Sequence, residues 1–187
     1  LTFPAGMSLK FKYDVNSLTS QLRERIPQVL ESEVLNQKRN SVLNKFSAAE
    51  RELIQNFEAM INKDGLTLAQ VQQEDGVRPE IMPVINKKAV MITELENMIT
   101  KGELTKKKAQ DIYAKYSARQ QDLMILVKKH VKLSQDLQTE VRELEKNETE
   151  GLVHAAMIHL RETYKDSKIS NWLDSYEKDV LENIPLF

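Results

Sequence analysis

The sequence predicts a mainly α-helical protein, and three observations lead to that prediction. Only 5 Gly and 5 Pro occur among the 187 residues, too few to separate the many short strands of a sandwich or barrel. Charged residues make up 29% of the chain, which is typical of long helices exposed to solvent. Apolar residues recur at steps of three and four over most of the length, which is the spacing of one helix face.

The first long helical segment is predicted over residues 17–63, after a base segment at residues 1–16. Apolar side chains follow helical spacing throughout this segment. Asp14 or Ser17 provides a side-chain oxygen that can accept a hydrogen bond from a free backbone N–H at the helix start. We therefore expect one amphipathic rod here.

Two features of this segment predict interruptions. Pro27 lacks a backbone donor, so we expect the helix to kink or restart there. The sequence Ser47-Ala-Ala-Glu50 has the spacing of a capping box, which predicts a break near Phe46.

A small β-hairpin and a short helix are predicted over residues 64–103. An Asp75-Gly76 turn separates two apolar runs, and Pro79 and Pro83 place the second run on a sheet edge. The capping-box sequence Thr93-Glu-Leu-Glu96 opens a helix that ends near Gly102. The second run carries a dense apolar patch, which either packs on that short helix or contacts a partner: Val77, Ile81, Met82, Val84 and Ile85.

The second long helical segment is predicted over residues 104–148. A heptad seam runs from Ile112 to Leu144, with polar exceptions at Arg119 and Glu140. Beyond it, residues 149–187 predict base helices, two short ones at about 150–164 and 168–183.

Length then predicts the architecture. Continuous helices over the two long segments reach roughly 70 Å and roughly 65 Å at ~1.5 Å per residue. Their similar lengths favour an elongated antiparallel helical coiled-coil arm, with the hairpin at its distal tip and both chain ends at its base. We expect one structural domain that is a fragment of a larger protein.

Composition argues against several functional classes. The absence of Cys excludes disulfides and thiolate sites, and three His are too few to favour a zinc site. Carboxylate pairs such as Glu50/Glu52 and Glu143/Glu145 have no apolar pocket to raise their pKa, so solvated helix surface is expected. We predict no catalytic residue, no metal ligand and no cofactor within this chain, and no segment that spans a membrane.

Charge is distributed unevenly along the second long segment. Residues 101–132 hold nine Lys or Arg and three acids, whereas residues 133–150 hold two bases and six acids. The basic half offers nucleic acid or an acidic substrate a surface, but only Tyr113 and Tyr116 are available for base stacking. A solvated helix flank is the favoured interpretation, and nucleic-acid binding is weakly supported.

Short motifs at both ends and in the middle resemble the helical insertion of bacterial Lon-like ATP-dependent proteases. The opening Phe3-Pro-Ala-Gly6 matches that family's Leu-Pro-Ala-Gly except at its first residue. The other matching motifs, in chain order, are Phe11, Val15, Leu18, Leu22 and Ile26-Pro27; Gly65-Leu-Thr-Leu68; Pro79-x-x-x-Pro83-Val-Ile; Leu95-Glu96 with Gly102; Tyr164-Lys-Asp166; Trp172-Leu173; and Asp179-Val-Leu-Glu-Asn183 through Phe187.

The resemblance implies a larger parent protein, an ATP-dependent serine endopeptidase of the cytoplasm that forms a homo-oligomer. Its AAA+ module uses ATP and magnesium, and its protease domain uses a Ser–Lys dyad. This chain has no Gly-x-x-x-x-Gly-Lys-Ser/Thr loop, so neither active site carries over to residues here.

Two functional hypotheses from different classes follow. The first is a non-catalytic accessory domain that projects from the ATPase module of a Lon-like protease and engages or gates protein substrates. The alternative is a free-standing coiled-coil interaction protein that dimerises through the seam. An independent enzyme has no supporting constellation of residues.

Overall fold

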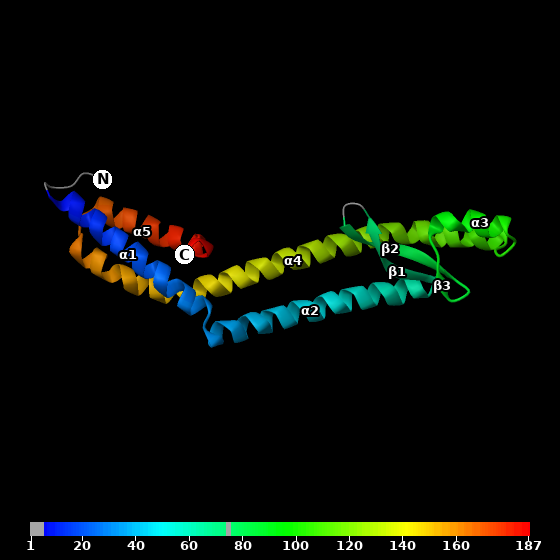
Figure 1. Ribbon diagram of the computed structural model, residues 1–187, viewed down its shortest axis with the longest axis horizontal. Helices are drawn as coiled ribbons and strands as arrows, with labels where there is room; N and C mark the ends of the chain where they lie inside the picture. Colours follow the sequence, from blue (N-terminus) through cyan, green and yellow to red (C-terminus); the bar gives the residue numbers. More distant parts are fainter. Residues whose placement is uncertain (1–5, 74–75) are drawn as a thin grey trace. The chain divides into compact units, whose positions relative to one another are not determined.

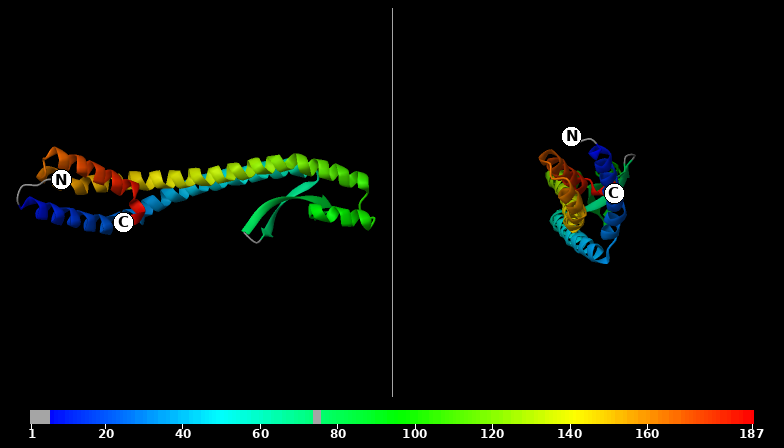
Figure 2. Two further views of the ribbon diagram at one scale, coloured as in Figure 1. Left: turned by 90° about the horizontal axis from the view of Figure 1, so that it is seen from above. Right: turned by 90° about the vertical axis from the view of Figure 1, so that its left-hand side faces the viewer.

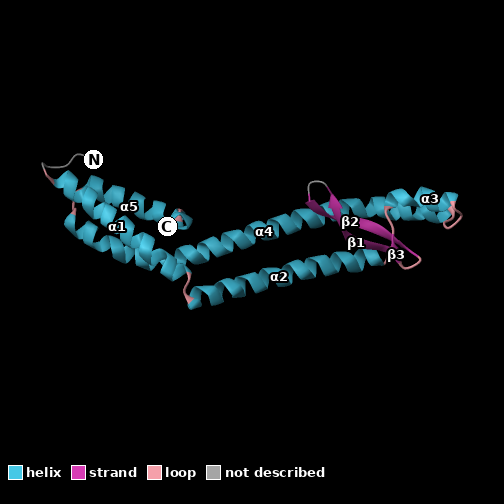
Figure 3. Cartoon of the chain, in the orientation of Figure 1, coloured by secondary structure: helices cyan, strands magenta, loops and turns pink. Residues whose placement is uncertain are grey.

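The computed structural model describes residues 6–73 and 76–187, of which 78% are helical, together with one small antiparallel sheet (Figures 1 and 3). The predicted mainly α-helical class is therefore confirmed. The elements in chain order are α1 (Met7–Leu30), α2 (Glu33–Asn62), β1 (Leu66–Gln73), β2 (Gly76–Ile85), β3 (Lys88–Ala89), η1 (Ile92–Glu94), α3 (Leu95–Thr100), α4 (Lys106–Thr163), α5 (Ser167–Glu182) and η2 (Ile184–Leu186).

The chain divides into two compact units, which we describe separately. Unit 1 contains the described part of residues 1–44 together with Asp136–Phe187. Unit 2 contains Lys45–Gln135. Both α2 and α4 contribute residues to each unit, because the boundaries fall within these two helices.

Helix α1 starts earlier than predicted. Its first residue is Met7, after Gly6 in the left-handed region at φ 83°, so neither Asp14 nor Ser17 caps it. Pro27 lies inside α1, which ends three residues later at Leu30. Helix α2 then begins at Glu33, and the Ser32 side chain accepts a hydrogen bond from the Leu35 N–H at 3.3 Å. The motif residues at 3–5 lie outside the described part of the chain.

Two predicted helix breaks are wrong. Helix α2 continues through Ser47-Ala-Ala-Glu50, with Phe46 and Phe57 buried on its inner face. Helix α4 continues through Gly151, where we predicted a separate base helix, and ends at Thr163. A glycine inside a helix costs about 1 kcal/mol. Burial of Val153 and Met157 immediately after it outweighs that cost.

The predicted hairpin is confirmed. Strands β1 and β2 pair antiparallel from Leu66↔Pro83 to Gln73↔Gly76, while Asp75 of the predicted turn lies outside the described residues. A second tight turn at Asn86 and Lys87, with φ 50° and 65°, connects β2 to β3. Positive φ at both positions is characteristic of a type I′ turn, which matches the twist of two-residue hairpins.

The prediction that Pro79 and Pro83 place β2 on a sheet edge is correct only in part. The strand order is β1-β2-β3, but β3 pairs only with Val84 and Ile85, so among the described residues β2 has an open edge at Pro79. The Val84 N–H donates to the Gly65 carbonyl at 2.9 Å. Because the backbone groups of successive strand residues point alternately to opposite sides, the nitrogens of Pro79 and Pro83 point away from β1. Pro83 accepts a bond from the Val90 N–H at 2.9 Å but has no N–H to return. This missing donor limits β3 to a two-residue pairing.

Short local signals end α3 and begin α4. Thr93 lies within η1 rather than at the start of α3, which begins at Leu95 without a side-chain cap. Gly102 adopts φ 77°, and the Glu103 N–H donates to the Met98 carbonyl at 3.0 Å, as in a Schellman C-cap. The Thr105 hydroxyl then caps α4.

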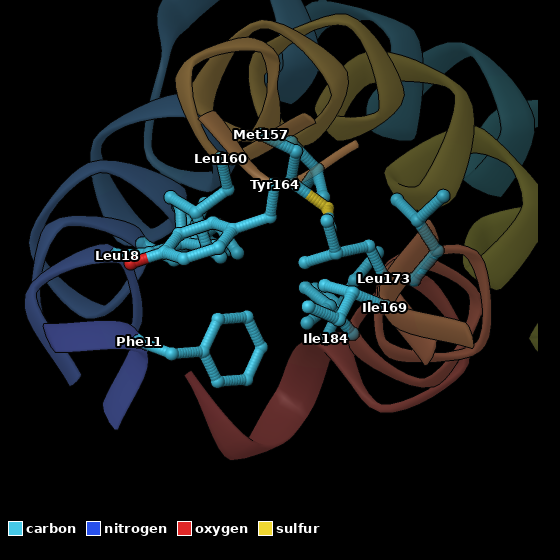
Figure 4. Close-up of a cluster of buried hydrophobic side chains, with 13 residues drawn as sticks. Phe11, Leu18, Met157, Leu160, Tyr164, Ile169, Leu173 and Ile184 are labelled. Carbon is cyan, nitrogen blue, oxygen red and sulfur yellow. The ribbon is translucent and has the colours of Figure 1, made fainter. Parts of the chain in front are cut away.

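The core of unit 1 forms where α1, the last turns of α4 and α5 lie side by side (Figures 2 and 4). Leu22, Met157 and Leu173 are fully buried in it. The Phe11 ring meets the rings of Tyr164 and Trp172 edge-on, with centroids 5.0 and 5.4 Å apart. Such contacts stabilise the arrangement beyond the area they bury.

One buried hydroxyl in this core makes unit 1 sensitive to alkali. The Tyr164 hydroxyl donates to the Asp14 carboxylate at 2.7 Å. Burial, and secondarily this hydrogen bond, raise the pKa of Tyr164 to about 12. The neutral phenol is therefore favoured in the folded state, and ionisation works against folding.

We expect unit 1 to lose stability as the pH rises from about 10, the pKa of an unfolded tyrosine, toward 12, the folded value. Below pH 10 the contribution is fully present, since both states bind the proton. Tyr164→Phe should remove this dependence while lowering stability at pH 7 by about 1 kcal/mol, through loss of the hydrogen bond. Urea unfolding followed by Trp172 fluorescence between pH 7 and 11.5 measures both effects. Equal pH slopes for wild type and variant would contradict the assignment.

Unit 2 packs part of the predicted seam face of α4 against α2 and the sheet. Leu123 and Leu126 are buried together with Phe57, Leu66 and Ile81 in one cluster. His130, at a seam position, is exposed, and its Nε2 lies 2.6 Å from a Glu50 carboxylate oxygen.

Candidate interaction surface

The structure separates the five residues of the predicted hairpin patch. Ile81 is fully buried in the unit 2 cluster, and Ile85 packs against the cluster around Leu95 and α3. Met82 is half-buried, while Val77 and Val84 are 56% and 41% exposed. Of the two alternatives stated above, packing on α3 is therefore correct for Ile85. Only Val77 and Val84 are exposed enough to contact a partner.

Strand geometry explains this division. Successive side chains of β2 point to opposite faces of the sheet, so Ile81 and Pro83 face inward while Met82 and Val84 face outward. Val77 lies on the inward-facing side but near the end of the hairpin, where the side chain is exposed. The sequence showed a dense apolar run but not which members the sheet would bury.

An apolar groove that the sequence reading missed lies in unit 2, between α2 and α4. It has a volume of about 360 Å³. Phe57 and Leu126 are buried at its floor, being 6% and 7% exposed. The remaining lining residues are Leu53, Met60 and Ile125, with the polar residues Asn56, Asp122 and Lys129.

A sequence signal for this groove was present. Residues 123–127 read Leu-Met-Ile-Leu-Val, five consecutive apolar residues, whereas one helix face accounts for only two of them. The structure buries Leu123 and Leu126 and leaves the other three exposed, Met124 by 61%, Ile125 by 45% and Val127 by 41%. These three apolar residues exceed what one helix face accounts for, and one of them, Ile125, forms part of the groove wall.

The charges beside the groove are unequally compensated. Arg119 donates to Asp64 at 2.7 Å and to Asp122 at 3.0 Å, so both carboxylates face a cation. These hydrogen bonds, that to Asp64 first, raise the pKa of Arg119. The two carboxylates share the single charge of Arg119, whereas Lys129 at the other end of the lining has no ion-pair or hydrogen-bond partner within the described residues.

The two tyrosines of the basic segment serve packing. Tyr116 is half-buried against the unit 2 cluster, and its pKa is raised by burial and then by Glu80. Tyr113 packs on the α3 cluster, with its hydroxyl 3.4 Å from the Ile92 carbonyl. Neither ring is presented as a free stacking platform, and nucleic-acid binding stays an untested prediction.

Two of the remaining candidates, His154 and Glu145, have polar side-chain partners at the surface. His154 Nδ1 lies 3.1 Å from Glu177, and Glu145 accepts from Arg39 at 2.6 Å. Across residues 6–73 and 76–187, no three His, Asp or Glu side chains are grouped so as to hold a metal ion.

Comparisons with known proteins add no identity. No family model, curated protein or solved structure matches this chain. In the described part of the chain, none of the helices has the length together with the apolar character required to cross a bilayer.

Proposed function

We propose that this chain is a non-catalytic accessory domain of a Lon-like ATP-dependent protease, which engages or gates protein substrates. One structural observation carries the proposal. Unit 1 contains the chain on both sides of unit 2, residues up to 44 and from 136 onward, while unit 2 is a single uninterrupted stretch. This topology suits an insertion whose first unit joins a host module and whose second unit is presented by two helices.

The exposed apolar residues of unit 1 support such a junction. Leu9 and Tyr13 lie one turn apart on α1 and are 76% and 73% exposed. Leu186, in η2, is 76% exposed. Exposed apolar side chains that lie together on a surface mark contacts with other proteins, and the ATPase module of the parent is the body that we assign to the pair Leu9 and Tyr13.

The finer features belong to the same proposal. In it, α2 and α4 form an elongated antiparallel coiled-coil arm, unit 1 forms the base, and the sheet forms the distal tip. The motifs at both ends and the Gly65-Leu-Thr-Leu68 and Pro79–Ile85 sequences support this assignment by resemblance. The parent is then a cytoplasmic homo-oligomer that uses ATP and magnesium outside this chain.

The coding context provides the first test. We expect a phosphate-binding loop upstream of this sequence and a Ser–Lys protease domain downstream of it in the same reading frame. An uninterrupted reading frame containing neither would contradict the proposal, and a concentration-dependent dimer of the chain would then favour the interaction-protein alternative.

The second test changes the exposed part of the hairpin in the full-length protein. Val77→Asp combined with Val84→Asp is expected to slow protein degradation by about tenfold, because apolar contacts at a binding surface carry much of its affinity. ATP hydrolysis and cleavage of a short peptide should be unchanged. Leu43→Asp, at an apolar residue of unit 1 that is 44% exposed, is the matched control. Equal degradation rates in all three proteins would remove the hairpin from substrate engagement.

A further inference from the structure

The groove between α2 and α4 has the dimensions of a short-segment binding site. Its lining residues span Leu53–Met60 on one helix and Asp122–Lys129 on the other. Two helical turns on each side give a length of about 11 Å at ~1.5 Å per residue. A segment that presents two or three apolar side chains fills such a groove.

Charge selects among apolar segments. Asp122 is already paired with Arg119, at 3.0 Å. Lys129, about two turns further along α4, is exposed and makes no ion pair with any described residue. A segment with a carboxylate beside its apolar residues would place that charge near Lys129 and gain from the attraction.

The same charges disfavour a second copy of this chain as the occupant. Lys129 lines the groove, and Lys128 and Lys132 are exposed on α4 within one turn of it. A two-fold axis beside Lys129 would bring these lysines close to their equivalents on the other copy, since such an interface pairs the same surface with itself. Like charges in that arrangement cost binding energy.

We infer that the groove binds an apolar segment of a protein substrate, with an acidic side chain adjacent to the segment's apolar residues. That the bound segment belongs to a substrate rests on the proposed function, whereas the preference for apolar and acidic side chains rests on the groove alone. Ile125 and Leu126 supply the apolar wall from α4, and Lys129 supplies the charge preference.

A charge-reversal experiment on the free 187-residue chain tests the inference. Two fluorescein-labelled peptides share the core Leu-Phe-Leu and differ only in carrying two Glu or two Lys beside it. Fluorescence anisotropy should show the Glu peptide binding about fivefold more tightly, which is the scale of one or two exposed charge contacts. Lys129→Glu should reverse that preference. Lys107→Glu makes the same charge change at an exposed residue outside the groove and should preserve it.

A further variant separates groove binding from adhesion elsewhere. Ile125→Asp, at a side chain 45% exposed, should weaken both peptides at least tenfold. Equal binding of the two peptides to wild type and to Lys129→Glu would overturn the inference. So would a dimer, seen by sedimentation velocity, that Ile125→Asp abolishes. None of these results depends on degradation by the full-length protein, so a failed groove leaves the hairpin test of the proposed function standing, and the reverse also holds.

Discussion

Replacing Leu22 by Ala is expected to lower the free energy of unfolding of unit 1 by about 3 kcal/mol. Leu22 is fully buried between α1, α4 and α5, where the deleted atoms would leave a cavity. Trp172 is the only tryptophan of the chain and packs against this core, so its fluorescence during urea unfolding reports the change in unit 1 specifically.

Leu9→Ala serves as the control for this experiment. Leu9 belongs to the same helix and is 76% exposed, so we expect a change within about 0.5 kcal/mol. Equal destabilisation by the two substitutions would contradict the packing of α1 described above. A larger effect of Leu9→Ala would require that its side chain be buried in the free chain.

Replacing Ile81 by Asp is expected to destabilise unit 2 by about 4 kcal/mol, because an unpaired carboxylate would enter an apolar cluster. Ile81 is fully buried beside Leu66 and Leu123. Hydrogen exchange of the β1 amides, followed by mass spectrometry, measures the change, since unit 2 contains no tryptophan to report it. Faster exchange across β1 is the expected result.

Val84→Asp is the matched control on the same strand. Its side chain is 41% exposed, and the carboxylate there remains hydrated, so β1 exchange should be nearly unchanged. The pair also bears on function. A charge at Ile81 tests only folding, whereas a charge at Val84 tests whether the exposed surface of the hairpin binds a partner. The sequence alone placed both residues in one patch. Unchanged β1 exchange in Ile81→Asp would contradict the assigned register.

Helix caps and turns were predictable where the signal is local and nothing competes with it. Thr105 before α4, Gly102 after α3 and the β1–β2 hairpin all follow from the preferences of single residues for particular backbone geometry. Asp166 likewise accepts from the Lys168 and Ile169 N–H groups at the start of α5. These features need only a few neighbouring residues to form.

Local signals failed where tertiary burial opposed them. A capping box at 47–50 and a glycine at 151 each favour a helix end by about 1 kcal/mol. Buried side chains on either side outweigh that preference, because each fully buried Val or Met contributes about 1.5–3 kcal/mol. Burial of Phe46 and Phe57 favours continuation of α2 through the capping box, and burial of Met157 favours continuation of α4 through Gly151.

The sequence by itself determined the helical class, the hairpin, the absence of thiolate chemistry and the apolar content of β2 and α4. Tertiary structure alone decided which of those apolar side chains are available. Ile81 and Val84 differ by their face of the sheet, and Leu126 and Ile125 differ by one step around a helix. Exposure is set by what packs against each face, so the groove and its free lysine exist only once α2 lies beside α4 in unit 2.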